Sequence, residues 1–182
     1  MNRAAQHTAA PDAQLTIRLL EEADINVIAD AFTAIGWDKP ASQYVRYLAE
    51  QDAGTRVVLV ALIAGDFAGY VTIEWHSHYT PFAEANIPEI VDFNVLPHYR
   101  RRHIGTHLLD EAERRIGERS PVVGIGVGLY PDYGAAQRMY VLRGYIPDGR
   151  GVAYDGQTSR PGQAVLVDDS LALFFTKQLH KA

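Results

Sequence analysis

Residues 94–107 read Asn-Val-Leu-Pro-His-Tyr-Arg-Arg-Arg-His-Ile-Gly-Thr-His, and this segment decides the fold. A strand-like apolar run ends at Pro97, and an amphipathic helix begins near Ile104. Free N–H groups and the dipole at a helix start bind anions, and arginine adds bidentate contacts to phosphate oxygens. Gly105 would let a ligand approach the backbone closely. The segment therefore favours a site for a diphosphate or polyphosphate, with a solvated basic loop as the alternative interpretation.

The usual nucleotide motifs are absent from this segment. It has neither the Gly-Lys-Ser/Thr of a Walker loop nor the G-x-G-x-x-G of a dinucleotide fingerprint. Gly124, Gly126 and Gly128 alternate with apolar residues further along, which is typical of a strand with one bare face. Either a packed element or an approaching ligand would use such a face.

Strands and helices follow one another on both sides of this segment. Hydrophobic periodicity and turn signals predict strands at 15–20, 56–64, 67–76, 87–96, 122–130, from 145 onward and at 171–177, and helices at 21–35, 41–51, 104–116 and 133–143. The stretch 75–87 is expected to be a substrate-shaping loop. This order predicts one α/β domain, with a mixed, mostly antiparallel twisted sheet of about six to seven strands and helices on both faces. Residues 1–14 are expected to form a flexible tail, and residues 15–182 the domain.

Composition argues against several classes of protein. The 182 residues include no cysteine, which excludes a disulfide framework, a thiolate metal site and a cysteine nucleophile. Lys+Arg 17 against Asp+Glu 22 gives a net charge of −5, which argues against nucleic-acid binding. Without the arginines at 100–102, 14 basic residues remain and the charge is −8, so positive charge is concentrated at the predicted helix start. No segment is apolar enough for a membrane partner or a signal peptide, and we expect a cytoplasmic location.

One block of the sequence resembles a known family. Residues 95–109 are similar to the acetyl-CoA loop of the GNAT N-acetyltransferase superfamily, usually written Q/R-x-x-G-x-G/A. Arg100 takes the Q/R place and Gly105 takes the final Gly. His103 stands where the first Gly is usual, so this histidine has to accept the backbone geometry of a glycine.

A second block follows in the same order as in the family. Residues 133–145 resemble the pattern N-x-x-A-x-x-L-Y-x-K-x-G-F/Y. Tyr133 replaces the usual Asn, whereas the pattern is matched at Ala136, Tyr140, Gly144 and Tyr145. The two blocks with a strand between them are fairly specific, and the predicted element order agrees with the GNAT fold.

The resemblance implies acetyl-CoA as cosubstrate and a direct transfer of its acetyl group to an amine. Backbone amides of the loop would cradle the pyrophosphate, and the end of the strand before it would pair with the pantetheine arm beside the glycine-faced strand. The residues that the resemblance implies for acetyl-CoA are Phe93, Asn94, Val95, Arg100, Arg101, Arg102, His103, Ile104, Gly105, Thr106, Tyr133 and Ala136.

Acetyl transfer also needs a base, because an amine with a pKa near 10 must lose a proton before it attacks. Glu89 is the first candidate, since some family members carry a glutamate base at this place in the strand, and Glu74 is the second. Asp92 is a third, and a water relay is an alternative. Strict alternation would put Glu89 and Phe93 on one face of the strand and Asp92 on the other. The resemblance makes Tyr140 the acid for the departing thiolate, whereas by itself it would be a core residue.

Other functions remain open on the sequence alone. His103 and His107 are spaced as a metal pair, but no Glu adjoins the first of them, and we predict no metal site. A small-molecule amine is the expected acceptor. The alternatives are a non-catalytic acyl-CoA-binding or regulatory module, and an enzyme that acetylates protein or peptide amines. A homodimer is one option for the oligomeric state.

Overall fold

The computed structural model of the chain describes residues 15–179. The predicted tail, residues 1–14, lies outside this range. The strands of the structure are β1 (Leu15–Leu19), β2 (Arg56–Ile63), β3 (Asp66–Glu74), β4 (Glu89–Val95), β5 (Val122–Gly128), β6 (Ile146–Tyr154), β7 (Gln157–Thr158) and β8 (Leu171–Gln178). Its helices are α1 (Asp24–Thr33), α2 (Ala41–Asp52), α3 (Thr80–Ala85), α4 (Ile104–Gly117) and α5 (Gly134–Leu142), with short 3-10 turns at Pro97–Tyr99 and Pro131–Tyr133.

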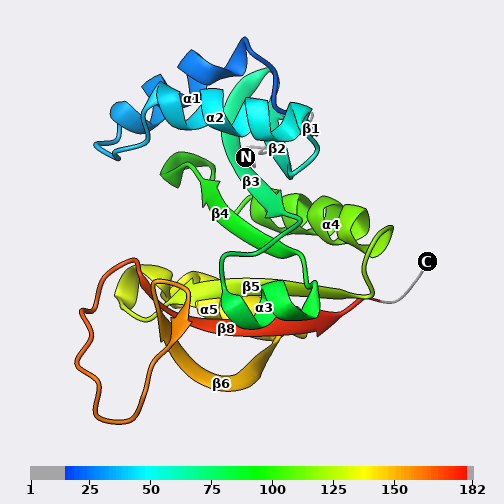
Figure 1. Ribbon diagram of the computed structural model, residues 1–182. Coiled ribbons are helices and arrows are strands. Elements are labelled where there is room, and N and C mark those ends of the chain that lie inside the picture. The colour runs from blue at the N-terminus through cyan, green and yellow to red at the C-terminus, as the bar shows by residue number, and fades with distance from the viewer. Residues whose placement is uncertain (1–14, 180–182) are drawn as a thin grey trace, which may run out of the picture.

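The strands form one mixed sheet in the order β1-β2-β3-β4-β5-β8-β6-β7 (Figure 1). All neighbours are antiparallel except β4 and β5, which run parallel. This confirms the predicted mixed, mostly antiparallel sheet. The sheet has eight strands because the two-residue β7 closes a hairpin with β6, and so short a strand gives no periodic signal.

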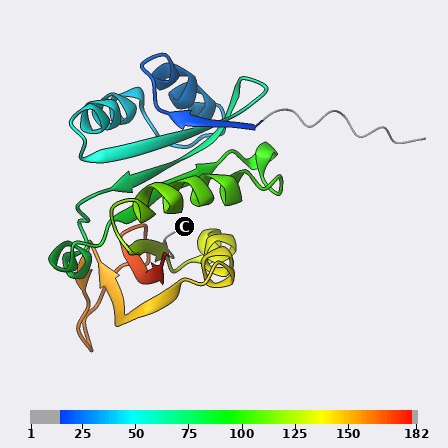
Figure 2. The same cartoon turned by 90° about the vertical axis from the view of Figure 1, so that its right-hand side faces the viewer.

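Helices cover both faces of the sheet, as predicted (Figures 1 and 2). On one face, α1 and α2 bury Phe32 and Tyr44 against Tyr70 of β3. On the other face, α4 buries Leu108 and its i+4 neighbours in a core shared with α5 and the apolar residues of β5. No helix in the range 15–179 is long and apolar enough to cross a bilayer.

The stretch 75–87 is more ordered than the sequence predicts. It contains helix α3, in which Phe82 is 2% exposed and lies against Gly124 of β5. The segment is too short and too rich in turn residues for a helical period to be visible, with Pro81 at the helix start. The predicted loop is therefore wrong for residues 80–85, which form a helix. Helix α3 covers the part of the sheet that α1 and α2 leave free on their face.

The bare face of β5 is filled by aromatic rings of the protein itself. A Cβ atom built on Gly124 would lie 2.2 Å from the ring of Phe82, and one on Gly128 would lie 2.5 Å from the ring of Tyr133. Gly126 faces the ring of Phe174 in the same way. Of the two interpretations of the alternating glycines, the structure supports packing.

Candidate active site

Strands β4 and β5 separate soon after they meet, and the separation creates the candidate site. They pair only at Glu89–Gly124 and Ile90–Ile125. Further along β4, the Leu96 N–H donates to the Ala68 carbonyl of the neighbouring β3 at 2.9 Å. Because main-chain groups alternate between the two edges of a strand, Phe93 and Val95 direct theirs toward β5, where the ladder has ended. Phe93 therefore offers its main-chain groups to an extended ligand such as a pantetheine arm, whereas at Val95 the carbonyl already accepts a hydrogen bond from Arg100.

A β-bulge in β4 changes which residues share a face. Tyr70 pairs with Asn94, but Thr72 pairs with Val91, so β4 carries one extra residue between them. Asp92 occupies this bulge with a φ of 48°. As a result Asp92 lies on the same face as Glu89, whereas the strict alternation assumed from sequence put them on opposite faces. That prediction was wrong because a bulge leaves no mark on the hydrophobic pattern.

The loop before α4 has the backbone of an anion site. Arg101 and His103 both take left-handed conformations, with φ of 60° and 59°, and His103 is the residue before the first turn of α4. Such a sequence of conformations turns successive N–H groups toward one concave surface. No side chain caps the helix start, so its first N–H groups remain available to a ligand. His103 thus accepts the geometry for which the related sequences use glycine.

Some residues of this loop are buried in the core, and others lie at the surface. Ile104 is 1% exposed and belongs to the core, so only its main chain can serve a ligand. A Cβ on Gly105 would lie 2.9 Å from the ring of Phe93, so this glycine makes room for Phe93. Arg100 donates through Nε to the Val95 carbonyl at 3.2 Å, and the Arg102 guanidinium lies 5.5 Å from the centre of the Tyr99 ring.

A groove of about 480 Å³ runs from the start of α4 to α5. It is lined by Thr106, Ala135, Arg138, Met139, Leu142 and Arg143. Thr106 was expected here from the loop motif, whereas Ala136 packs against the core and its neighbour Ala135 faces the groove. Arg138 is a functional candidate that the sequence pattern did not single out. Its local sequence carries no signal that separates it from a surface arginine.

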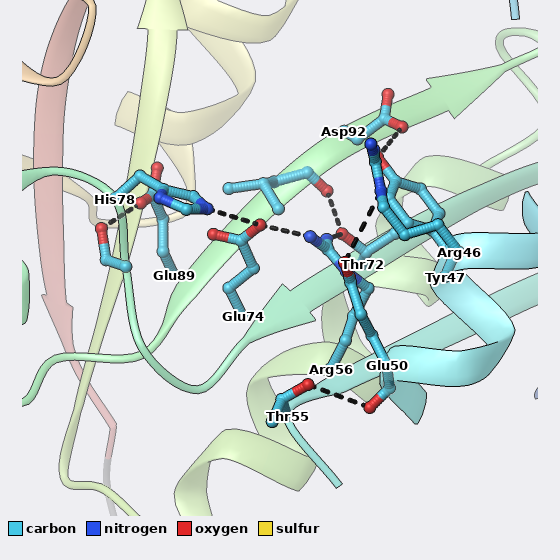
Figure 3. Close-up of polar contacts among 12 residues, drawn as sticks. Arg46, Tyr47, Glu50, Thr55, Arg56, Thr72, Glu74, His78, Glu89 and Asp92 are labelled. Atoms are coloured by element: carbon cyan, nitrogen blue, oxygen red, sulfur yellow. Dashed lines mark hydrogen bonds and ion pairs between the residues drawn. The ribbon is translucent and has the colours of Figure 1, made fainter. Parts of the chain in front are cut away.

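Glu89 and Glu74 are direct cross-strand partners, and both are buried, at 6% and 9% exposure. The Glu74 carboxylate forms an ion pair with Arg56 of β2 (Figure 3). Glu89 accepts a hydrogen bond from the Ser77 hydroxyl and forms no ion pair with any described residue. Burial raises the pKa of Glu89 to about 7; the Ser77 hydrogen bond opposes this rise, and the charge of Glu74 adds to it.

Arg56 makes the two carboxylates differ, because it pairs with Glu74 alone, and no sequence pattern singled it out. Its side chain is 7% exposed and donates to Glu50, Glu74 and, at 2.7 Å, the Thr72 hydroxyl (Figure 3). Its guanidinium also lies 4.3 Å from the centre of the Tyr47 ring. An arginine at the start of a strand usually indicates a surface residue.

Asp92, the third carboxylate, is held in its ionised form. It accepts hydrogen bonds from Lys39 Nζ at 2.6 Å, Tyr47 at 2.9 Å and Tyr70 at 2.5 Å. Burial raises the pKa of Asp92, but the charge and hydrogen bond of Lys39 and the two tyrosine hydroxyls outweigh burial, so the net shift is downward. A carboxylate this well paired is a poor proton acceptor.

Tyr140 lies in the core that α5 shares with the sheet and is 4% exposed. Its ring centre is 5.9 Å from that of Tyr145. Burial raises the pKa of Tyr140, and its hydroxyl forms no hydrogen bond with residues 15–179. The phenol is therefore protonated at neutral pH and has a hydrogen to donate, while the raised pKa makes it a weaker acid than an exposed tyrosine.

Tyr133 has a structural contact that the family pattern does not suggest. Its ring packs on Gly128, and its hydroxyl donates to Asp169 Oδ1 at 2.8 Å. Tyr130 donates to the same carboxylate, so the two tyrosines anchor the segment before β8. Within the described part of the chain, no three His, Cys, Asp or Glu residues gather as a metal site.

Comparison with solved structures supports the same fold. The chain is similar to an N-acetyltransferase from Staphylococcus aureus Mu50, at 13% identity and a TM-score of 0.68, with 92% of this chain and 99% of that chain covered. It is also similar to the paiA N-acetyltransferase of Thermoplasma acidophilum in complex with coenzyme A, at 12% identity and a TM-score of 0.63, with 91% and 99% covered. A third similar structure is yncA from Salmonella typhimurium with its cofactor acetyl-CoA, at 19% identity and a TM-score of 0.63, with 92% and 95% covered.

Comparison of the sequence itself adds the family. No curated protein matches the chain significantly. The model of the acetyltransferase (GNAT) family matches residues 23–145, a span that includes α1, the separation of β4 from β5, the loop before α4 and the whole of α5. By this match, over more than half of its length, the chain belongs to the GNAT acetyltransferase family.

Proposed function

We propose that the protein transfers the acetyl group of acetyl-CoA to a primary amine of a small molecule, with Glu89 as the base and Tyr140 as the acid. The observation that carries the proposal is the contrast between Glu89 and Glu74. They are adjacent and both buried, but among residues 15–179 only Glu74 has an arginine paired with it. Glu89, with a pKa raised to about 7, is suited to take a proton from an ammonium group near neutral pH.

The residues present fit acetyl-CoA, which supplies a thioester-activated acetyl group when bound. The left-handed residues Arg101 and His103 and the uncapped start of α4 provide N–H groups for the pyrophosphate. The main-chain groups of Phe93 and the N–H of Val95 can pair with the pantetheine amides. The groove that includes Thr106 and Arg138 extends from the loop toward α5 and can hold the remaining nucleotide.

The two proton-transfer residues lie on opposite faces of the sheet. Glu89 begins β4 on the face that α1 and α2 cover, whereas Tyr140 lies on α5 on the opposite face. In the proposed reaction Glu89 accepts the proton of the acceptor ammonium through its carboxylate, directly or through a water. Tyr140 donates its phenolic proton to the departing sulfur. Glu89 lies where β4 and β5 still pair, on the face opposite Tyr140, so the substrates in the gap must reach both residues for them to act in one turnover.

A small acceptor is favoured because the β6–β7 hairpin is tied down beside Glu89. Gln157 of β7 donates to the Thr80 hydroxyl at 3.0 Å, and Tyr79 donates to Asp148 at 2.8 Å. Gly156, in the turn of the hairpin, lies against the His78 carbonyl. These contacts hold the hairpin against the segment that carries Ser77, the hydrogen-bond partner of Glu89, and a fixed hairpin here favours a small acceptor over an extended peptide.

Calorimetric titration with acetyl-CoA is the first test. We expect saturable binding at one site per chain and weaker binding for Arg138→Ala, which keeps the fold but removes a charge from the groove. Absence of saturable binding would contradict the proposal. Binding without transfer to any amine would favour the non-catalytic acyl-CoA module, and transfer to peptide amines alone would favour a protein acetyltransferase.

A further inference from the structure

Asp92 holds an unfavourable backbone conformation at the bulge of β4. Its φ of 48° lies in the left-handed region, which a residue with a side chain rarely adopts unless its surroundings fix it. The register change between β3 and β4 occurs at this residue. Asp92 is therefore the point at which the strand deviates from a regular ladder, directly before Phe93.

The surroundings of Asp92 fix it through its carboxylate. Five donors from four parts of the chain converge on the two oxygens: the connection between α1 and α2, then α2, β3 and β4 itself. These donors are Lys39 Nζ at 2.6 Å, Gln43 Nε2 at 2.8 Å, Tyr47 OH at 2.9 Å, Tyr70 OH at 2.5 Å and Asn94 Nδ2 at 2.8 Å. The Lys39 ammonium also lies 5.7 Å from the centres of the Phe32 and Tyr70 rings.

The position of the bulge determines where the next main-chain groups point. Beyond the bulge Asn94 pairs with Tyr70 and Leu96 bonds to Ala68, so both face β3. Phe93 between them faces the gap toward β5, where no strand pairs with it. A regular ladder without the extra residue would reverse this alternation and turn the Phe93 N–H toward β3.

We propose that Asp92 is a positioning residue for acetyl transfer: its carboxylate fixes the bulge that directs the Phe93 N–H into the gap, where it can donate to the thioester oxygen. The inference rests on the proposed function, because it assigns the acetyl group to this gap. Asp92 itself touches neither the acetyl group nor the acceptor. Its five partners are all protein groups, so it acts through the backbone that follows it.

If Asp92 served only the stability of the fold, a largely buried carboxylate would be an unfavourable residue at this position. An ionised side chain 18% exposed must be compensated by its neighbours, and apolar residues of similar size usually stabilise a core at least as well. The partners of Asp92 also include Lys39, which belongs to the α1–α2 connection, so the carboxylate ties this connection to β4.

The test compares three variants with the wild type. Asp92→Asn keeps the shape and tolerates the left-handed conformation, but its amide nitrogen cannot accept hydrogen bonds from Tyr47, Tyr70 and Gln43. Asp92→Gly relieves the backbone strain and removes the anchor entirely. Asp24→Asn is the matched control, because Asp24 is another buried carboxylate, 7% exposed, paired with Arg18 far from the gap.

We expect kcat to fall about tenfold or more in both Asp92 variants while the calorimetric Kd for acetyl-CoA changes less than about threefold. Asp24→Asn should lower the melting temperature without changing kcat per binding site. A wild-type kcat in both Asp92 variants, or a loss of acetyl-CoA affinity as large as the loss of kcat, would overturn the proposal.

A second measurement separates this inference from the proposed function. In protein labelled with ¹⁵N-phenylalanine and free of ligand, the amide resonance of Phe93 should shift or broaden in Tyr70→Phe, which removes a donor to Asp92 without altering a chain neighbour of Phe93, and stay in place in Asp24→Asn. An unchanged Phe93 resonance would overturn the positioning role even if the wild type proves inactive. Inactive wild type with a displaced resonance would instead count against the proposed function alone.

Discussion

Glu74 and Glu89 face each other across β3 and β4, and Arg56 pairs with only one of them. This single ion pair makes the two buried carboxylates unequal. The guanidinium lies beside Glu74, and the charge of Glu74 adds to the burial that raises the pKa of Glu89. A buried carboxyl group whose pKa is raised to about 7 is suited to exchange protons near neutral pH.

The pH profile should follow Glu89. The base form of Glu89 is required for transfer, so activity depends on its fraction deprotonated. With a pKa of about 7, kcat/KM should fall about tenfold per pH unit well below pH 7 and level off above it. The measurement is the acidic limb of kcat/KM between pH 5 and 9. A limb that ends near the ordinary glutamate value, or one retained in Glu89→Gln, would contradict this role.

Removal of the same charge should stabilise the fold at high pH. Because burial raises the pKa of Glu89 from 4.5 to about 7, the folded protein binds its proton more tightly than the unfolded chain, and stability falls as the pH rises from 4.5 through 7. Glu89→Gln should therefore add up to about 3 kcal/mol to the free energy of unfolding at pH 8 and almost nothing at pH 4. Urea unfolding at both pH values measures the difference, and an equal effect at both would contradict the pKa shift.

Loss of Arg56 should be costly, and loss of Glu74 with it should be less so. Arg56→Met leaves Glu74 buried without its cation, which typically destabilises a protein by about 3–5 kcal/mol. The double variant Arg56→Met, Glu74→Gln removes both charges and should recover most of this loss. A double-mutant cycle by urea unfolding checks the coupling. Additive losses would show that the pair does not interact as the contacts indicate.

Tyr140→Phe should slow turnover without weakening the fold. Its hydroxyl has no hydrogen bond with the described residues, so its removal should leave the melting temperature unchanged. If Tyr140 is the acid, kcat should fall about 10²-fold with little change in the KM for acetyl-CoA. Tyr145→Phe is the matched control: it loses a hydrogen bond of 3.0 Å to Glu113, which should cost about 1 kcal/mol of stability, and it should keep full kcat. Equal kcat in the two variants would remove Tyr140 from the reaction.

The parts of the fold that repeat a local pattern could be predicted from the sequence. The i+4 stripe from Ile104 to Ile116 gave α4, and the alternating residues of β5 gave a buried strand. The bulge at Asp92 could not be predicted, since one extra residue in a strand depends on its partner strand and on donors as distant as Lys39. Helix α3 was missed because six residues are too few for a periodic signal.

The residues of the candidate site were likewise only partly predictable from the sequence. Glu89, Tyr140 and the loop before α4 lie in or between segments with a recognisable spacing, and the resemblance to one family gave them roles. Arg56 and Arg138 act through three-dimensional proximity, and nothing in their local sequence distinguishes them from surface arginines. The use of Gly105 and Gly128 also depended on which distant ring packs against each of them.

The most direct test is to incubate the purified protein with acetyl-CoA and a panel of small primary amines, and to measure released thiol and product mass together. The central claim predicts thiol release that depends on one class of amine, a product heavier by one acetyl group, and loss of both signals in Glu89→Gln near pH 7. Thiol release that no amine stimulates, or the same rate in Glu89→Gln, would contradict it.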